Sequence, residues 1–264
     1  MRDGVRSART KLLRAAEHLR TIKRRIAAYS ASKPHKIARK ATGQKRINVP
    51  KAPPKEIAIL AGEMVYQMRS ALDHLTFELI KANPNISATN PDWRESCQFP
   101  LRTRLPKGKA APLPKTDFFR NLPGVSDRAF TIIEGMQPYY RGNPGKETSA
   151  YLLLLAHLSN IDKHRHLNLI CPRVRQSRHI RYAGGQTIGG YQMLDRGAIV
   201  EPEPTIYGYK PVNVHRRYTA LVAFNEREHL GEASAMPVDV LLERILYQLN
   251  LFVVPTLIKL IKNP

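Results

Sequence analysis

The sequence predicts a mainly α fold of the α+β class, an up-and-down helical bundle with a small antiparallel β insertion before its C-terminal helix. Two observations predict it. Apolar residues recur every three or four positions in four long segments, which is the period of an amphipathic helix. Between the third and fourth of these segments, residues 167–235 are rich in β-branched and aromatic residues and are punctuated by glycine pairs, which is typical of short strands.

The first 55 residues predict one helix and one linker. Residues 1–30 form the first bundle helix, because apolar positions from Val5 to Ile26 follow steps of three, four and seven residues while Arg and Lys fill the rest. Residues 31–55 are rich in Lys, Ala and Pro and show no sustained period. We expect this second segment to be a basic, mobile linker.

Residues 56–166 predict the core of the bundle. A helix over 56–81 begins after Pro53–Pro54 and carries an apolar stripe, and a second long helix covers 149–165. Prolines mark a long loop between them, in which residues 97–101 form a short extended segment. Two short helices are expected at 116–121 and 125–136.

The C-terminal part predicts strands and then a helix. We expect strands at 167–174, 180–183, 187–194 and 218–224. The final helix, residues 236–264, has Pro237 in its first turn, and Pro255 in its interior should kink or split it.

The chain is strongly basic. It carries 43 Lys and Arg against 21 Asp and Glu, a formal net charge of +22, and its pI is near 10.3. Most of the excess lies in residues 1–55, where 17 basic residues face 2 acidic ones for a net of +15, and residues 94–120 and 163–181 add +5 and +6. Such clusters attract phosphate backbones, so nucleic acid is the expected partner, RNA more than DNA. The candidate binding residues are Arg24, Arg25, Lys36, Arg39, Lys40, Lys45, Arg46, Lys163, Arg165, Arg173 and Arg175.

Other classes of protein are less compatible with this sequence. The N-terminus lacks the apolar core of a secretory signal, which predicts a cytoplasmic protein. The longest apolar stretches are short or interrupted by polar residues and proline, so no membrane partner is expected. Cys97 and Cys171 form no disulfide framework and no zinc spacing, and the sequence lacks the glycine and serine motifs of nucleotide-binding and hydrolase folds. We expect no cofactor and no metal.

Arg69 and His74 are the candidate catalytic pair. They lie five positions apart on the helix 56–81 and flank its apolar stripe, about 140° apart around the axis. An Arg with four residues before a His resembles the signature of the HEPN superfamily, α-helical proteins that include metal-independent endoribonucleases of toxin and antiviral defence systems. The resemblance implies a homodimer whose cleft is lined by two such pairs, with an antitoxin or defence partner.

The same resemblance implies a mechanism. His74 acts as general acid or base and Arg69 stabilises charge on the phosphorane, while the 2′-hydroxyl of RNA attacks the adjacent phosphate without a metal ion. Ser70 lies one turn before His74 and would orient the imidazole, where the superfamily usually has Asn, Asp or His. Asp73 is on the same face as a further supporting residue.

A second cluster, NIDKHR at residues 160–165, ends the helix 149–165. Together with RSALDHL at 69–75, FPL at 99–101 and QPY at 137–139, it resembles a group of uncharacterised bacterial proteins with HEPN-like folds. Asp162 could pair with Arg69 or His74 across the bundle, and His164 could join them at a phosphate. The alternatives are a charged helix end that the macrodipole favours, and a metal site formed by Asp73, His74, His157, Asp162 and His164.

Two functions therefore stay open. One is a HEPN-like endoribonuclease. The other is a noncatalytic nucleic-acid-binding or protein-interaction module with the same helical fold, in which Arg69, Asp73 and His74 form a structural hydrogen-bond network.

Overall fold

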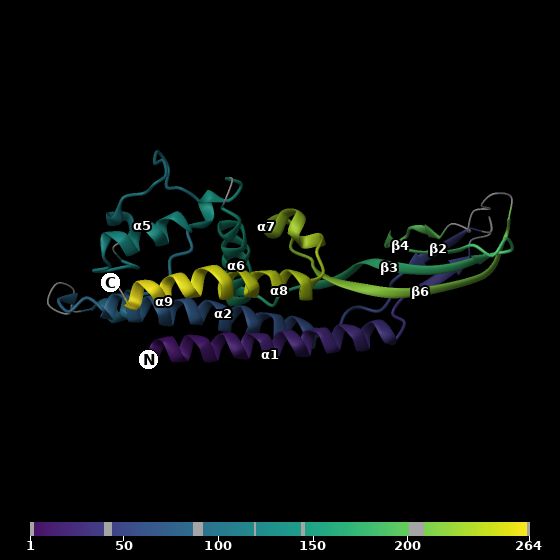
Figure 1. Cartoon of the computed structure of the whole chain (residues 1–264), viewed down its shortest axis with the longest axis horizontal. Coiled ribbons are helices and arrows are strands. Elements are labelled where there is room, and N and C mark those ends of the chain that lie inside the picture. Colours follow the sequence, from purple (N-terminus) through teal and green to yellow (C-terminus); the bar gives the residue numbers. More distant parts are fainter. Residues whose placement is uncertain are drawn as a thin grey trace. The chain divides into compact units, whose positions relative to one another are not determined.

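The computed structural model describes residues 3–39, 44–86, 92–118, 120–143, 146–200 and 209–262. About 54% of the chain is helical and about 21% forms strands, in two three-stranded antiparallel sheets among these residues. The expected helical bundle with a single β insertion is therefore wrong, and the fold is an α+β mix (Figure 1). The error arose mainly in the predicted linker, where two short strands pair with each other and the second of them also pairs with a strand far along the chain.

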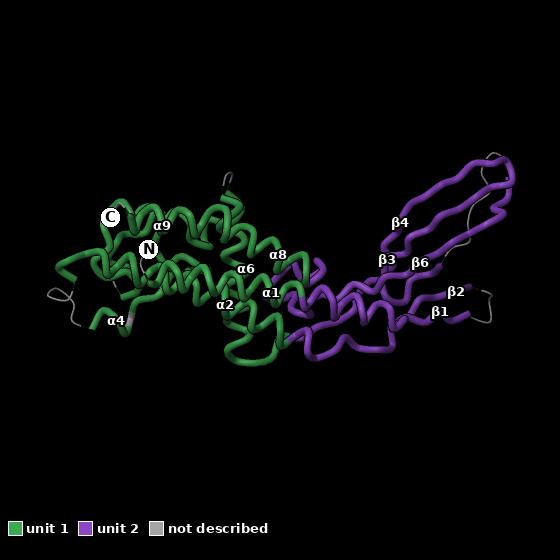
Figure 2. Tube along the Cα trace, turned by 60° about the horizontal axis from the view of Figure 1, so that its bottom comes forward, with its two compact units in different colours: residues 1–20, 59–167, 239–264 green, residues 21–58, 168–238 purple. Residues whose placement is uncertain are grey.

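The chain divides into two compact units, each assembled from separated stretches of sequence (Figure 2). Unit 1 comprises residues 1–20, 59–167 and 239–264, and unit 2 comprises residues 21–58 and 168–238. The domains expected from the sequence were instead runs of consecutive residues. One consequence concerns charge: unit 2 combines part of the basic N-terminal region with most of the 163–181 patch, and holds 20 Lys and Arg against 7 Asp and Glu, a net charge of +13.

Unit 1 is built from helices. The predicted helices are present with shifted ends, because the apolar stripes that define them are buried: Met64, Met68, Leu72 and Leu75 of the second helix are fully inaccessible. The helical elements that lie wholly or mostly in unit 1 are α1 (Asp3–Ala31), α2 (Lys55–Lys81), α4 (Trp93–Ser96), η1 (Lys115–Phe118), α5 (Asp127–Gly135), η2 (Pro138–Tyr140), α6 (Glu147–His164), α8 (Val238–Gln248), η4 (Leu249–Val253) and α9 (Val254–Lys262).

The C-terminal run Val238–Lys262 is split as its internal proline predicts. Pro255 has no N–H to donate, and the chain adopts a π-helical turn, Leu249–Val253, immediately before α9. By length and composition this run is apolar enough to cross a membrane, and 44% of its most apolar window is buried within the chain. Core helices of soluble proteins meet the same criterion, so the expected absence of a membrane partner stays a prediction.

The smaller sheet of unit 2 has the strand order β1–β2–β5. Strands β1 (Lys36–Arg39) and β2 (Lys45–Asn48) pair antiparallel, and β2 pairs with β5 (Ile199–Val200). Ile47 on β2 is fully buried and bonds through its main chain to residues 197 and 198. Burial of this residue ties the basic segment, expected to be mobile, into the unit.

The larger sheet of unit 2 has the order β4–β3–β6. Its strands are β3 (Leu169–Tyr182), β4 (Thr187–Asp195) and β6 (Pro211–Phe224), and α7 (Arg227–Leu230) and η3 (Gly231–Ala235) follow β6. The predicted strands 167–174 and 180–183 are one continuous strand, β3. Along β3, Val174, Gln176, Ile180 and Tyr182 are buried, whereas the alternate residues 175, 179 and 181 are exposed. This period of two gives β3 one buried side and one open side.

Candidate functional site

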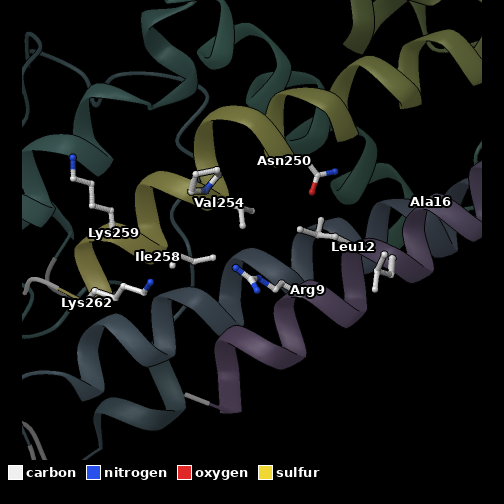
Figure 3. A pocket seen from close by; sticks show the side chains of 10 residues that line it. Arg9, Leu12, Ala16, Asn250, Val254, Ile258, Lys259 and Lys262 are labelled. Carbon is white, nitrogen blue, oxygen red and sulfur yellow. The ribbon is translucent and has the colours of Figure 1, made fainter. Parts of the chain in front are cut away.

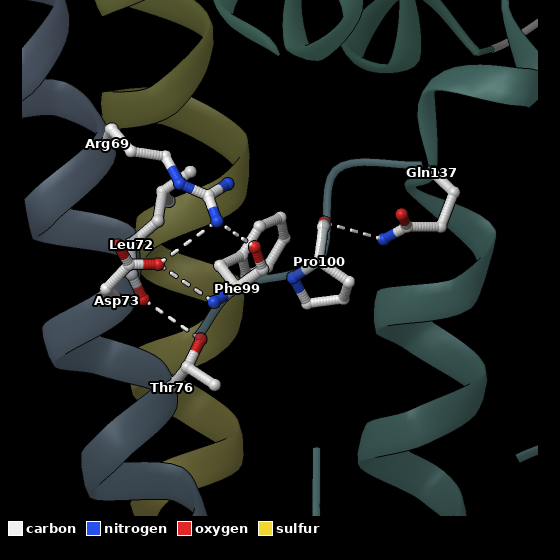
Figure 4. A network of polar contacts seen from close by, with 7 residues as sticks. All are labelled: Arg69, Leu72, Asp73, Thr76, Phe99, Pro100 and Gln137. Atoms are coloured by element: carbon white, nitrogen blue, oxygen red, sulfur yellow. Dashed lines mark hydrogen bonds and ion pairs between the residues drawn. The ribbon is translucent and has the colours of Figure 1, made fainter. Parts of the chain in front are cut away.

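Arg69 and Asp73, one turn apart on α2, bind the main chain of Phe99 (Figure 4). The guanidinium of Arg69 donates a hydrogen bond to the Phe99 carbonyl, and the Phe99 N–H donates to the Asp73 carboxylate at 2.9 Å. The Arg69 Nη2 and Asp73 Oδ1 atoms are 3.4 Å apart. Because the Phe99 side chain is fully buried, these two residues fix the loop at the point where it enters the core.

Gln137 holds the same loop from its other side. Its side chain is fully buried, and Nε2 donates to the carbonyls of Pro100 at 3.1 Å and of Ile133 at 3.0 Å. Its Oε1 accepts from the N–H of Arg102 at 3.0 Å. The RSALDHL, FPL and QPY segments, which the sequence analysis grouped by resemblance, therefore meet in one hydrogen-bond network (Figure 4).

A buried carboxylate extends this network. Glu134, at 4% exposure, accepts hydrogen bonds from the Leu113 N–H at 2.9 Å and from the hydroxyl of Tyr139 at 2.6 Å. The Tyr140 hydroxyl also donates to it, and burial together with this carboxylate raises the pKa of Tyr140 to about 12. The QPY segment thus supplies both a glutamine and a tyrosine to the packing of the loop.

Burial dominates the electrostatics of the Arg69–Asp73 pair. The side chain of Arg69 is 13% exposed, and burial lowers its pKa. Burial also raises the pKa of Asp73, against the opposing effect of Arg69 and of the Phe99 N–H. The second guanidinium nitrogen, Nη1, is buried without a hydrogen-bond partner in the described structure. Arg69 is thus turned toward the protein interior, away from any bound phosphate.

His74 lies elsewhere. It is half-buried and lines a separate hollow of about 550 Å³, in which Asp3, Asp73 and Glu78 offset the charges of Lys81 and Arg94. The expected hydrogen bond from Ser70 to His74 is not formed, although the structure describes both residues. Within one chain, the predicted catalytic pair does not share a site.

The predicted supporting residues on α6 also have other surroundings. Asp162 packs so closely on Gly62 of α2 that any side chain at residue 62 would collide with its carboxylate. Burial raises the pKa of Asp162, and His166 opposes this effect. Lys163, His164 and Arg165 are exposed at the end of α6. Asp162 therefore explains a glycine requirement on α2 and does not pair with Arg69 or His74.

Unit 2 contains a basic hollow of about 760 Å³. Basic and imidazole side chains line it, and its other lining residues are small or hydroxyl-bearing, with no carboxylate among them. The end of α1, the connection from α1 to β1, and strands β3 and β6 form this basic hollow. Its basic and imidazole lining residues are Lys33, His35, Arg175, Arg216 and Arg217.

His35 is the titratable group inside the basic hollow. Its ring stacks at a tilt on Tyr218, with 5.2 Å between ring centroids. Burial lowers the pKa of His35, and Lys33 adds to the effect. Its Nδ1 atom is buried without a hydrogen-bond partner among the described residues.

The structure distributes the predicted nucleic-acid-binding residues unevenly. Arg175 lines the basic hollow, whereas Arg25 pairs with Glu56 at 2.8 Å and Arg173 pairs with Asp195 at 2.7 Å. Arg24 donates to the Thr21 hydroxyl. Lys40 lies outside the described residues. The remaining predicted residues are Lys36, Arg39, Lys45 and Arg46 on the strands β1 and β2, and Lys163 and Arg165 in unit 1.

Sequence reasoning missed four of the residues that line the basic hollow. Arg216 and Arg217 lie in a segment of zero net charge, and Lys33 and His35 lie in the predicted linker. The pairing of β3 with β6, about 40 positions later in the chain, brings Arg217 beside Arg175, and the ring contact of His35 with Tyr218 holds the 33–35 segment against β6. The Arg216–Arg217 dipeptide within a β-branched segment was the only local signal.

A second hollow, in unit 1, has a different character (Figure 3). It measures about 610 Å³ and lies between α1 and the C-terminal helices, with Leu12, Leu13, Val254 and Ile258 as its apolar wall. Its cationic side chains are Arg9, Lys259 and Lys262.

Comparison with known proteins identifies no family for this chain. No family model matches it, and neither the curated proteins nor the solved structures include a match. Within the described ranges, no three His, Cys, Asp or Glu side chains are grouped so as to hold a metal ion. The interpretation of the chain therefore depends on its own charge and geometry.

Proposed function

We propose that this chain is a noncatalytic nucleic-acid-binding protein, and that the basic hollow of unit 2 holds the phosphate backbone. The observation that carries the proposal is the composition of that hollow, in which five basic or imidazole side chains converge with no carboxylate. Grouped cations bind polyphosphates by releasing condensed counterions, so the affinity depends little on sequence and strongly on salt.

The wider charge distribution supports the same assignment. Unit 2 has a net charge of +13. On strand β3 of its larger sheet, the side chains of Arg175 and Arg181 are exposed. Arg216 and Arg217 are consecutive on the edge strand β6, so their side chains leave opposite faces of the strand, and both line the basic hollow from this edge of the sheet. Arg guanidinium groups suit this role because they bind phosphate through two parallel hydrogen bonds.

The test compares two double variants of equal charge change. A fluorescein-labelled RNA of about 12 nucleotides is titrated with the wild type, with Arg175→Ala/Arg217→Ala and with Lys259→Ala/Lys262→Ala, at about 50 mM and about 200 mM salt. The proposal predicts that the first variant loses affinity and shows a salt slope smaller by about 1 to 2, while the second resembles the wild type. Equal loss in both variants, or no binding by the wild type, would contradict it.

The endoribonuclease hypothesis stays a prediction, because it requires a second copy of the chain. Arg69 would have to leave the Phe99 carbonyl to reach a phosphate, which makes this the weaker candidate. Incubation of the wild type, Arg69→Ala and His74→Ala with RNA in EDTA separates the two functions. Metal-independent cleavage that both substitutions abolish would establish the nuclease; intact RNA supports the binding protein.

A further inference from the structure

The open face of the larger sheet extends beyond the basic hollow. Arg175, Ser177, His179 and Arg181 alternate along β3, and three of the four are exposed. Opposite them, antiparallel register places residues 219, 217, 215 and 213 of β6 and residues 193, 191, 189 and 187 of β4. Directly opposed residues share a face, so these positions form one surface. We call it the β4–β3–β6 face.

Rings and cations are interleaved on the β4–β3–β6 face. One row across the three strands is Tyr191, Ser177 and Arg217, and the next is Gly189, His179 and His215. Tyr191 is 73% exposed, which is more than any other large apolar side chain of the described chain. Gly189, directly opposite His179 on β4, contributes no side chain, and a Cβ at this position would lie 3.6 Å from the His179 Nδ1 atom. The two imidazoles are direct cross-strand neighbours.

We infer that the β4–β3–β6 face binds single-stranded nucleic acid, with bases stacked on Tyr191, His179 and His215 and phosphates held by Arg175, Arg181 and Arg217. This inference rests on the proposed function and names the form of nucleic acid that the site selects.

The exposed rings of this face favour single-stranded over double-stranded nucleic acid. A duplex offers its phosphates to any basic surface, but its bases are already stacked on each other inside the helix. An exposed tyrosine or imidazole on a sheet has a partner only where base faces are free, as in a single strand. Sheets that display aromatic side chains between basic ones bind single-stranded RNA in this way in other folds.

The spacing of side chains along β3 also fits a single strand of nucleic acid that runs along the sheet. Side chains on one face of β3 repeat about every 6.6 Å, so Arg175 to Arg181 covers about 20 Å. Ser177, whose side chain is small, lies between Tyr191 and Arg217 in this register. Arg175, Ser177, Arg217 and Thr219 of this face also line the basic hollow, so the face and the hollow are continuous.

The experiment compares affinities for three probes of one sequence: a single-stranded RNA of about 12 nucleotides, the corresponding single-stranded DNA, and the blunt DNA duplex. Fluorescence anisotropy gives each Kd for the wild type, Tyr191→Ala, Tyr191→Phe and the matched control Tyr66→Ala, whose tyrosine is 61% exposed on α2 in unit 1. Tyr191→Trp, excited in the presence of each probe, reports stacking directly by fluorescence quenching.

The inference predicts single-strand affinities at least about tenfold above that of the duplex, and a loss of about 5- to 150-fold for Tyr191→Ala, since one base stacked on an aromatic ring contributes about 1–3 kcal/mol. Tyr191→Phe and Tyr66→Ala should stay near the wild type, and Tyr191→Trp should be quenched by single strands only. Equal affinity for the duplex, or an unaffected Tyr191→Ala, overturns this inference and leaves the proposed function standing. Absence of binding to every probe overturns both.

Discussion

Arg69 donates a hydrogen bond to the main-chain carbonyl of Phe99, 30 residues further along the chain. Through this bond the arginine of the most conspicuous motif of the sequence, an arginine and a histidine five positions apart, holds a proline-rich loop. Asp73 completes the arrangement by accepting the Phe99 N–H. A buried arginine that satisfies a carbonyl has a structural role that the residue spacing cannot reveal.

Arg69→Met should lower the free energy of unfolding by about 2–4 kcal/mol, because it leaves the Phe99 carbonyl without its donor and Asp73 without its cationic neighbour in a buried site. Urea unfolding followed by circular dichroism measures the loss. His74→Ala is the matched control and should change stability by no more than about 1 kcal/mol, since His74 is only half-buried. Equal effects of the two substitutions would show that the Arg69–Phe99 bond contributes little.

Gln137→Leu should cost about 2–3 kcal/mol in unfolding free energy. The substitution introduces an apolar side chain of similar size and removes three hydrogen bonds, and it leaves the Pro100 carbonyl and the Arg102 N–H unsatisfied. The same change at exposed Gln98 should stay within about 0.5 kcal/mol. A stable Gln137→Leu protein would mean that the loop is held by its apolar contacts alone.

His35 should make the stability of the protein depend on pH. Its pKa is lowered in the folded chain, so between about pH 7.5 and about pH 5.5 the unfolded chain takes up a proton near its ordinary pKa while the folded chain does not. Stability that is present above the unfolded pKa is therefore lost as the pH falls. His35→Phe keeps the ring contact with Tyr218 and should flatten this part of the pH profile. Parallel profiles for the two proteins would contradict the assignment.

The two thiols should differ in reactivity. Cys171 is 7% exposed and burial raises its pKa, so a disulfide reagent at about pH 7.5 should modify it only after unfolding. Cys97 is partly exposed, and burial together with Asp73 raises its pKa too, so it should react in the folded protein but slowly. Rapid modification of both thiols in the native protein would argue against this packing.

The sequence predicted local structure better than assembly. Each long helix could be recognised because its apolar stripe repeats within a few turns, and the π turn before Pro255 follows from one missing N–H. The strands β1 and β2 were missed because they are four residues long, and β1 is exposed throughout, so neither shows a period. The pairing of β2 with β5 depends on residues about 150 positions away.

For the candidate site too, the sequence predicted local features but not which of them come together. Charge counting located basic segments but not the basic hollow, since Arg175 and Arg217 become neighbours only through the pairing of β3 with β6. The spacing of Arg69 and His74 predicted a joint site only between two copies of the chain, and it gave no sign that Arg69 donates to the Phe99 carbonyl within one chain. Long-range hydrogen bonds decided both outcomes, and a single sequence does not record them.

Ultraviolet cross-linking of the wild-type protein to a labelled single-stranded RNA, followed by peptide mapping, tests the central claim most directly. The proposed function predicts adducts on peptides that contain Lys33 and His35, on β3 from Arg175 to Arg181, and on β6 around Arg217. Adducts on the α2 peptide that carries Arg69 and His74, with none on unit 2, would contradict it.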